Sequence, residues 1–279
     1  MQQNVKIALG ANLFGNHIRT DLCIESLLKV KERYPDNVDL YNLQFKDQSK
    51  IGRVHPDIQT LYILEESNRD YVTGTKRTIP MMRELFNKLA GLNYEYFAFT
   101  NDDIIVSDRL IKTFLNDTSF DSWSFSRLAI EPITSLSDKI IGDHYQVAGF
   151  DSNIIKTQWW LNNFDKFPNY VLGHPCWDVH YATLLMRFGN SSLCNKWPPQ
   201  IFHIKHGDES HYSSPERDYN YGLYWKPSKF DVDMWHNYLF NVLLKRPGVN
   251  YWQPHENELE LEKKYFNDEW FKNNYWSYQ

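Results

Sequence analysis

Residues 96–105 read Tyr-Phe-Ala-Phe-Thr-Asn-Asp-Asp-Ile-Ile. This mostly apolar run ending in Asn-Asp-Asp predicts a buried strand with polar side chains at its carboxyl end, where open α/β sheets bind ligands. Asn101 and Asp103 are two residues apart, so their side chains point the same way if the backbone stays extended. Oxygen ligands in that arrangement suit Mg²⁺ or Mn²⁺ bridging a diphosphate. The alternative interpretation is an Asx turn that caps the next element.

Strand and helix patterns alternate on both sides of this stretch. Short apolar runs predict strands, and apolar residues at helical spacing predict helices. Ser107 is placed to cap a further helix. The expected strands are 5–9, 38–45, 61–64 and 96–100, and the expected helices are 20–34 and 79–92. This alternation predicts an α/β domain with a largely parallel sheet.

The pattern changes after about residue 122. We expect extended backbone, one further helix and a loop-rich segment that together complete the sheet. Two more helices are expected in the tail, separated by a Pro-Gly turn. The extended segments are 123–130 and 145–155, the helix is 176–188, the loop-rich segment is 190–214, and the tail helices are 231–245 and 258–273.

The composition excludes several classes of protein. Of 279 residues, 42% are hydrophobic and 23% are charged, which fits a chain with a buried core and excludes disordered or collagen-like chains. The net charge of −5 gives no general attraction to nucleic acid. Three cysteines without a Cys-x-x-Cys pair disfavour a disulfide scaffold and a thiolate zinc site. No secretion signal or membrane-span-length apolar segment is evident, so we expect a cytoplasmic protein; peripheral membrane contact stays open.

Basic residues and histidines form two further candidate sites. Lys76 and Arg77 precede the predicted helix 79–92, where backbone N–H groups and cations suit a phosphate group. His203 and His206 are three residues apart, and imidazole binds Mn²⁺ or Zn²⁺ when neutral and pairs with phosphate when charged. Taken singly, each of these residues is more typical of a solvated or hydrogen-bonded loop.

Three residues of the second half are candidates for contact with a hydroxyl group. Asp178 falls at the start of the predicted helix 176–188, where it either stabilises the helix dipole or acts as a general base. Asp151 either closes a turn or contacts a ligand hydroxyl. Trp177 belongs either to the core or to a platform for sugar stacking, which the 16% aromatic content allows.

In this order, the segments over roughly residues 3 to 215 resemble a nucleotide-diphospho-sugar transferase of the GT-A fold. In such enzymes an Asp-x-Asp motif at this strand end holds Mn²⁺ or Mg²⁺ against the donor diphosphate, and a later His often completes the metal shell. The resemblance implies Asp103 and His206 as metal ligands, with His203 an alternative ligand or a donor contact. Asn101 stands where the first Asp of the motif would be, which is a departure from the pattern. The helix-start Asp178 matches an acceptor base of inverting members.

The resemblance implies a Rossmann-like, mostly parallel sheet flanked by helices. We expect a transferase domain at 1–225, with a nucleotide-sugar-binding half at 1–120 and an acceptor-side half at 121–225. A helical, aromatic-rich extension packed on this domain would follow at 226–279. The implied assignments are Asp178 as catalytic residue, Lys76, Arg77, Asn101, Asp102 and His203 as donor-binding residues, Asp151 and Trp177 as acceptor-binding residues, and Asp103 and His206 as metal ligands.

The expected activity is sugar transfer from a nucleotide-diphosphate donor to a hydroxyl of a glycan or glycolipid, with Mn²⁺ or Mg²⁺ assisting departure of the diphosphate. A metal-dependent phosphoester hydrolase is one alternative, since it uses the same Asp and His residues, although such enzymes usually cluster more carboxylates around two metals. A non-catalytic carbohydrate-binding protein is another, because it explains the aromatic residues. The predicted partners are the nucleotide-sugar and a carbohydrate acceptor.

Overall fold

The structure, a computed structural model, describes residues 5–15, 17–46, 53–140, 142–146, 149–194, 199–206 and 214–224. The two predicted tail helices and the extension 226–279 lie outside these residues. Within them, no helix is both long enough and apolar enough to cross a membrane.

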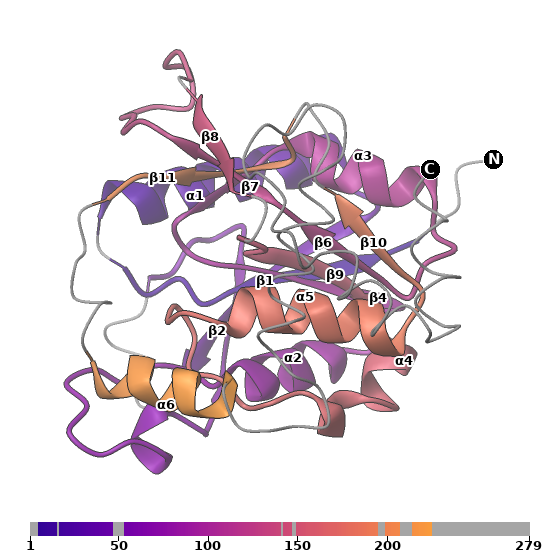
Figure 1. Cartoon of the computed structure of the whole chain (residues 1–279). Coiled ribbons are helices and arrows are strands. Elements are labelled where there is room, and N and C mark those ends of the chain that lie inside the picture. Colours follow the sequence, from indigo (N-terminus) through magenta and orange to yellow (C-terminus); the bar gives the residue numbers. More distant parts are fainter. Residues whose placement is uncertain are drawn as a thin grey trace, which may run out of the picture.

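A seven-stranded sheet forms the centre of the fold (Figure 1). The strand order is β10-β6-β9-β4-β1-β2-β3, and every neighbouring pair is parallel except the two pairs that β9 makes. The predicted, largely parallel sheet is therefore confirmed. Its strands are β1 (Ile7–Ala11), β2 (Val38–Phe45), β3 (Gln59–Leu64), β4 (Tyr96–Thr100), β6 (Ser122–Phe125), β9 (Ser152–Lys156) and β10 (Ser191–Cys194).

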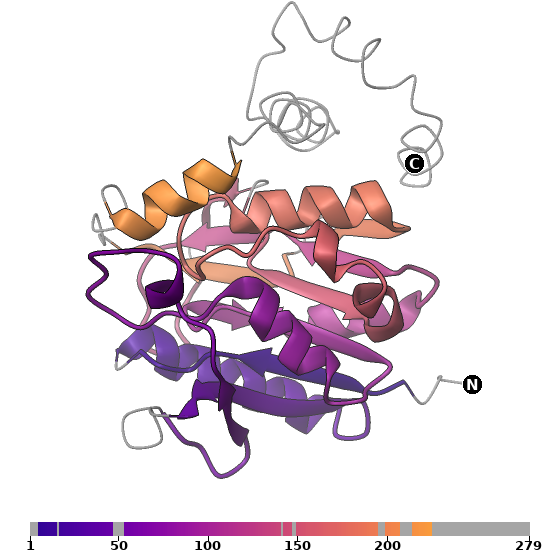
Figure 2. The same ribbon diagram turned by 90° about the horizontal axis from the view of Figure 1, so that it is seen from below.

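Helices cover both faces of this sheet because the side chains of its central strands alternate between two apolar cores. Tyr96 and Ala98 pack in one core with α1 and α3, whereas Phe97 and Phe99 pack in the other with α2, α4 and α5. Seen from below in Figure 2, α2, α5 and α6 lie on the near side of the strands. The helices are α1 (Ile18–Arg33), α2 (Met82–Ala90), α3 (Asp108–Asn116), α4 (Thr157–Leu161), α5 (Trp177–Phe188) and α6 (Pro215–Tyr224), with short 3₁₀ turns at Asn68–Asp70 and Phe164–Lys166.

A second, four-stranded sheet has the order β5-β11-β7-β8. The chain crosses from the large sheet to this small sheet three times, and the first two crossings are short. Residues 101–103 join β4 to β5, and Ser126 alone joins β6 to β7. These two crossings place the ends of β4 and β6 next to the small sheet. Its strands are β5 (Ile104–Val106), β7 (Arg127–Ile130), β8 (Gly142–Gln146) and β11 (Ile201–Ile204).

The second half differs from the sequence expectations in four ways. The expected extended segment 145–155 overlaps two strands of different sheets, β8 and β9. The extended segment 123–130 is two strands in different sheets, because the chain turns at the buried Ser126. The segment expected to be loop-rich, 190–214, contains β10 and β11, each too short to show a clear pattern. Helix α6 was not expected, since Pro215 and its polar neighbours are typical of loops.

Candidate active site

Asp103, His203 and His206 converge at the junction of the two sheets. Asp103 lies just before β5, and β11 runs antiparallel to β5 with His203 opposite Ile104, so His203 comes next to Asp103. The Nε2 atoms of His203 and His206 are 3.3 Å and 3.4 Å from Asp103 Oδ2. One ligand atom from each residue lies within 4.8 Å of the other two. These distances allow one metal ion to reach all three side chains.

The chemistry of the three side chains fits a divalent cation. Burial by itself would raise the pKa of Asp103, but the close contacts with His203 and His206 outweigh it and hold this pKa well below its usual range. The second oxygen of this carboxylate, Oδ1, is buried and accepts no hydrogen bond from the described residues. One carboxylate with two imidazoles suits Mn²⁺ better than Mg²⁺, which prefers oxygen ligands alone.

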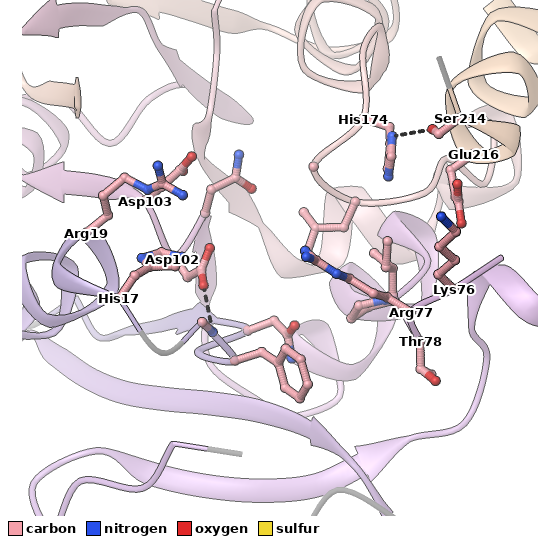
Figure 3. Close-up of a pocket in the computed structure, with 18 of the residues that line it drawn as sticks. His17, Arg19, Lys76, Arg77, Thr78, Asp102, Asp103, His174, Ser214 and Glu216 are labelled. Carbon is pink, nitrogen blue, oxygen red and sulfur yellow. Dashed lines mark hydrogen bonds between the residues drawn. The ribbon is translucent and has the colours of Figure 1, made fainter. Parts of the chain in front are cut away.

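Asn101 and Asp102, also in the β4–β5 connection, point to different partners. Asn101 donates from Nδ2 to Asp151 Oδ1 (2.9 Å), while its own Oδ1 is buried and has no hydrogen-bond donor among the described residues. Asp102 faces the loop after β1, where its Oδ2 accepts from the Gly15 N–H (3.1 Å) and the Thr20 hydroxyl (3.2 Å) (Figure 3). Asp102 therefore holds the β1–α1 loop in place beside the site.

Arg127 is a central charged residue that the sequence analysis did not select. It begins β7, contacts Asp151 through an ion pair, and is also influenced electrostatically by Asp178 and Asp103. A Cβ atom on Gly149 would lie 2.4 Å from Arg127 Nε, so the backbone there makes room for the guanidinium. The sequence did contain an indication of its importance, because Arg127 is the lone charged residue in the segment 123–130. We call Asn101, Asp103, Arg127, Asp151, His203 and His206 the sheet-junction cluster.

Asp178 lies in the first turn of α5, as predicted, and is half-buried. Burial raises its pKa to about 7, with the Asp151 carboxylate adding to the shift and Arg127 opposing it. A carboxylate with this pKa exchanges a proton near neutral pH, which a general base requires. The residue before the helix, Cys176, has φ 85°, a left-handed conformation that residues other than glycine rarely adopt.

A cavity of about 700 Å³ opens beside this cluster (Figure 3). Asn101, Asp102, Asp103 and His206 line it on the side of the sheets. The opposite side, which we call the loop wall, consists of lining residues from segments 74–80, 172–174 and 214–216. Lys76 and Arg77 are exposed on the loop wall, across the cavity from Asp102 in Figure 3. Six of the predicted donor and metal residues thus share one pocket.

The two predicted acceptor contacts, Trp177 and Asp151, are not among the residues that line this cavity. Trp177 is only 2% exposed and packs against Phe99 and Tyr181, so it belongs to the core and the expected contact with an acceptor is wrong. Asp151 is also 2% exposed, and its two oxygens are taken by Asn101 and Arg127. Asp151 is therefore an internal partner of Asn101 and Arg127 in the sheet-junction cluster.

Comparisons with known proteins bear on the fold. No protein-family model and no curated protein sequence matches the chain. Similar solved structures include S. aureus TarS 1–349 in complex with UDP-GlcNAc, with 10% identity, coverage of 96% of this chain and 75% of that chain, and a TM-score of 0.47. Drosophila β1,4-galactosyltransferase 7 in complex with manganese, UDP-Gal and xylobiose has 11% identity, coverage of 76% and 74%, and a TM-score of 0.41.

The galactosyltransferase LgtC, in complex with donor and acceptor sugar analogs, has 11% identity, coverage of 78% and 95%, and a TM-score of 0.35. The similarity to nucleotide-sugar transferases predicted from the sequence motifs is thus found again among solved structures. At this level it concerns the fold alone, so a function has to be argued from the site itself.

Proposed function

We propose that this protein is a glycosyltransferase that moves a sugar from a nucleotide-diphosphate donor to a hydroxyl acceptor. The observation that carries the proposal is the convergence of Asp103, His203 and His206 beside a cavity whose opposite wall presents Lys76 and Arg77. A cation site facing two cationic side chains suits a ligand with several negative charges between them. The diphosphate of a nucleotide-sugar is such a ligand.

Each residue of the site has its own role in the proposed reaction. Asp103, His203 and His206 would hold a divalent cation, for which Mn²⁺ is the best fit. Asn101 lines the same cavity, and its buried Oδ1 atom, which has no hydrogen-bond donor among the described residues, is a further candidate oxygen. The cation would neutralise charge on the departing diphosphate. Lys76 and Arg77 bind the same phosphates from the loop wall. Since their side chains are exposed, we expect them to assist donor binding without being essential to it.

Asp178 would accept the proton of the attacking hydroxyl group. Its raised pKa means that it is largely ionised only above about pH 7, and it returns the proton readily to water. Arg127 offsets part of the repulsion between the Asp151 and Asp178 carboxylates and so opposes the rise in the pKa of Asp178. Direct attack assisted by such a base predicts inversion at the anomeric carbon.

Titration calorimetry with UDP and GDP, each with and without MnCl₂, tests the proposal. We expect binding of one nucleotide that requires Mn²⁺, and we expect Asp103→Ala to abolish the Mn²⁺-dependent part. Asp36→Ala, a change of an exposed carboxylate on a turn, serves as the matched control and should bind like the wild type. Absence of nucleoside-diphosphate binding under every condition, or unchanged binding by Asp103→Ala, would overturn the proposal.

Activity assays separate the alternative functions. Incubation of the UDP- or GDP-linked sugar with a mixture of sugar acceptors should release the nucleoside diphosphate together with a glycosylated product. Hydrolysis of p-nitrophenyl phosphate at a comparable rate would instead indicate a phosphoester hydrolase. Retention on immobilised glycans without any nucleotide binding would indicate a carbohydrate-binding protein.

A further inference from the structure

Helix α6 brings two buried polar side chains to the loop wall. Asn220 is fully buried and Glu216 is 5% exposed, whereas Asp218 on the same helix is exposed. Buried amides and carboxylates are costly unless they are hydrogen-bonded. The partners of Asn220 and Glu216 therefore indicate what α6 holds in place.

Asn220 holds the segment that leads to Asp178. Its Oδ1 accepts from the N–H of Val171 (2.9 Å), and its Nδ2 faces three carbonyl oxygens, those of Val171 (3.0 Å), Pro175 (3.1 Å) and His174 (3.4 Å). One amide thus spans residues 171–175. Cys176, with its left-handed backbone, follows at once, so the hydrogen bonds of Asn220 determine how the chain enters α5.

Glu216 holds the other half of the loop wall through Asn68. Glu216 Oε1 accepts from Asn68 Nδ2 (2.9 Å). Asn68 is fully buried and in turn fixes Ile79, accepting from the Ile79 N–H at Oδ1 (2.9 Å) and donating its own N–H to the Ile79 carbonyl (2.9 Å). The Asn68 carbonyl also accepts from the Val72 N–H (2.8 Å). Asn68 therefore closes the base of the loop that carries Lys76 and Arg77.

We infer that α6 is a clamp whose two buried polar residues have separate positioning roles. Asn220 fixes the backbone segment that leads to Asp178. Glu216, through Asn68, fixes the base of the loop that carries Lys76 and Arg77. The inference rests on the proposed function for its kinetic consequences. The hydrogen bonds go to different segments, so the two residues affect different steps. Asn220 acts on proton transfer, and Glu216 acts on donor binding.

Substitutions of Asn220 test the first role. Asn220→Leu removes every hydrogen bond of the amide, and Asn220→Asp keeps the acceptor for Val171 but loses both N–H donors. We expect either change to lower kcat by about tenfold or more, since small misplacements of a reacting group are costly, with the donor KM within about twofold of the wild type. Asp218→Asn is the matched control on the exposed face of α6 and should leave both constants unchanged.

Substitutions of Glu216 test the second role. Glu216→Met removes the acceptor for Asn68, and we expect the donor KM to rise about fivefold, as for one lost hydrogen bond, with kcat little changed. Glu216→Gln keeps an oxygen at the same place and should restore the wild-type KM. A merely structural role would not give this split between KM and kcat. Equal changes in both constants for Asn220 and Glu216 variants that remain folded would overturn the inference.

A carbon-13 NMR titration of the Asp178 carboxyl group keeps this inference testable apart from the proposed function. The groups that face Asp178 are Asp151 before β9, Arg127 at the start of β7 and Cys176 on its own segment. Moving Asp178 relative to them should shift its titration midpoint in both Asn220 variants and leave it unchanged in Glu216→Met. An unshifted midpoint in folded Asn220→Asp would refute the Asn220 role. Failure of the wild type to bind any nucleotide would refute only the proposed function.

Discussion

The two sides of the cavity are built by different means. The sheet-junction cluster is held by strands: Asp103 immediately precedes β5, which pairs with the strand of His203, and Asp151 and Arg127 are joined by a partly buried ion pair. The loop wall presents Lys76 and Arg77 as exposed side chains on a segment that α6 fixes only at its base. In the proposed function, the first side is a rigid metal site with the proton acceptor Asp178 beside it, and the second is an adjustable surface for phosphates. We therefore expect changes in the cluster to affect stability and kcat, and changes in the loop wall to affect donor binding.

The largest effect should follow removal of Arg127. In Arg127→Met, Asp151 loses its ion-pair partner inside the protein, and nearby Asp178 and Asp103 lose a compensating charge. Leaving the buried Asp151 carboxylate without its cationic partner should cost about 3 kcal/mol of unfolding free energy, at the low end for a buried pair because Arg127 is partly exposed. Urea denaturation measures the change. Arg33→Met is the control, because Arg33 is 70% exposed and pairs with Asp108 at 3.8 Å; its cost should stay below about 1 kcal/mol. Equal costs for the two variants would show that the cluster does not depend on Arg127.

Asp178→Asn should be the most damaging change to activity that leaves the fold intact. Loss of a general base lowers kcat by about 10²- to 10⁴-fold. In the wild type, the raised pKa of about 7 predicts that kcat/KM rises about tenfold per pH unit below pH 7 and levels off above it. A wild-type rate independent of pH between 5 and 8 would exclude Asp178 as the base.

Asp178→Asn should also make the unfolding free energy of the protein less dependent on pH. The folded protein keeps the Asp178 proton up to about pH 7, whereas the unfolded chain releases it near pH 4. The stabilising contribution is therefore complete below about pH 4 and is lost as the pH rises through 7. Asp178→Asn removes this loss, so its unfolding free energy should fall less than that of the wild type between pH 5 and 8. A steeper fall in the variant would contradict the assignment of the raised pKa to Asp178.

The fold was largely predictable where local pattern and long-range packing agree. The strands 38–45 and 96–100 begin and end where the sequence places them, because apolar side chains on both faces are buried in two cores. β10 and β11 were missed because four-residue strands with polar neighbours owe their conformation to pairing with β6, β5 and β7.

Site residues were predictable where they belong to a short motif, in which residues close in sequence can bind the same kind of ligand. Asp103, His203 and His206 were selected from short motifs, and the pairing of β11 with β5 explains why they lie together in the structure. Glu216 was missed because its partner Asn68 is 148 residues away in the sequence. Arg127 was missed although it is the lone charge in segment 123–130, because no motif links it to Asp151. Trp177 was misplaced because spacing alone does not distinguish a core ring of α5 from an exposed one.

A smaller effect is expected on the loop wall. Lys76→Ala and Arg77→Ala each remove one exposed cation from the phosphate side of the cavity, so each should raise the donor KM about three- to tenfold and leave kcat nearly unchanged. The increase should shrink at higher salt, because exposed charges are screened. Lys112→Ala, on the exposed surface of α3, is the matched control. A fall in kcat at saturating donor would show that these residues act in the chemical step and not only in binding.

The smallest effect concerns Cys176, which joins the loop wall to Asp178. With φ 85° its backbone is strained, and its side chain makes no capping hydrogen bond to α5. Glycine adopts this conformation without the strain that a Cβ causes, so Cys176→Gly should be more stable than Cys176→Ala by about 1 kcal/mol. The comparison cancels the loss of the thiol, which both variants share. Thermal or urea unfolding measures the difference, and kcat shows whether the strain serves the position of Asp178. Equal stability of the two variants would mean that the loop changes its conformation once the cysteine is gone, and that the hydrogen bonds of Asn220 do not hold it.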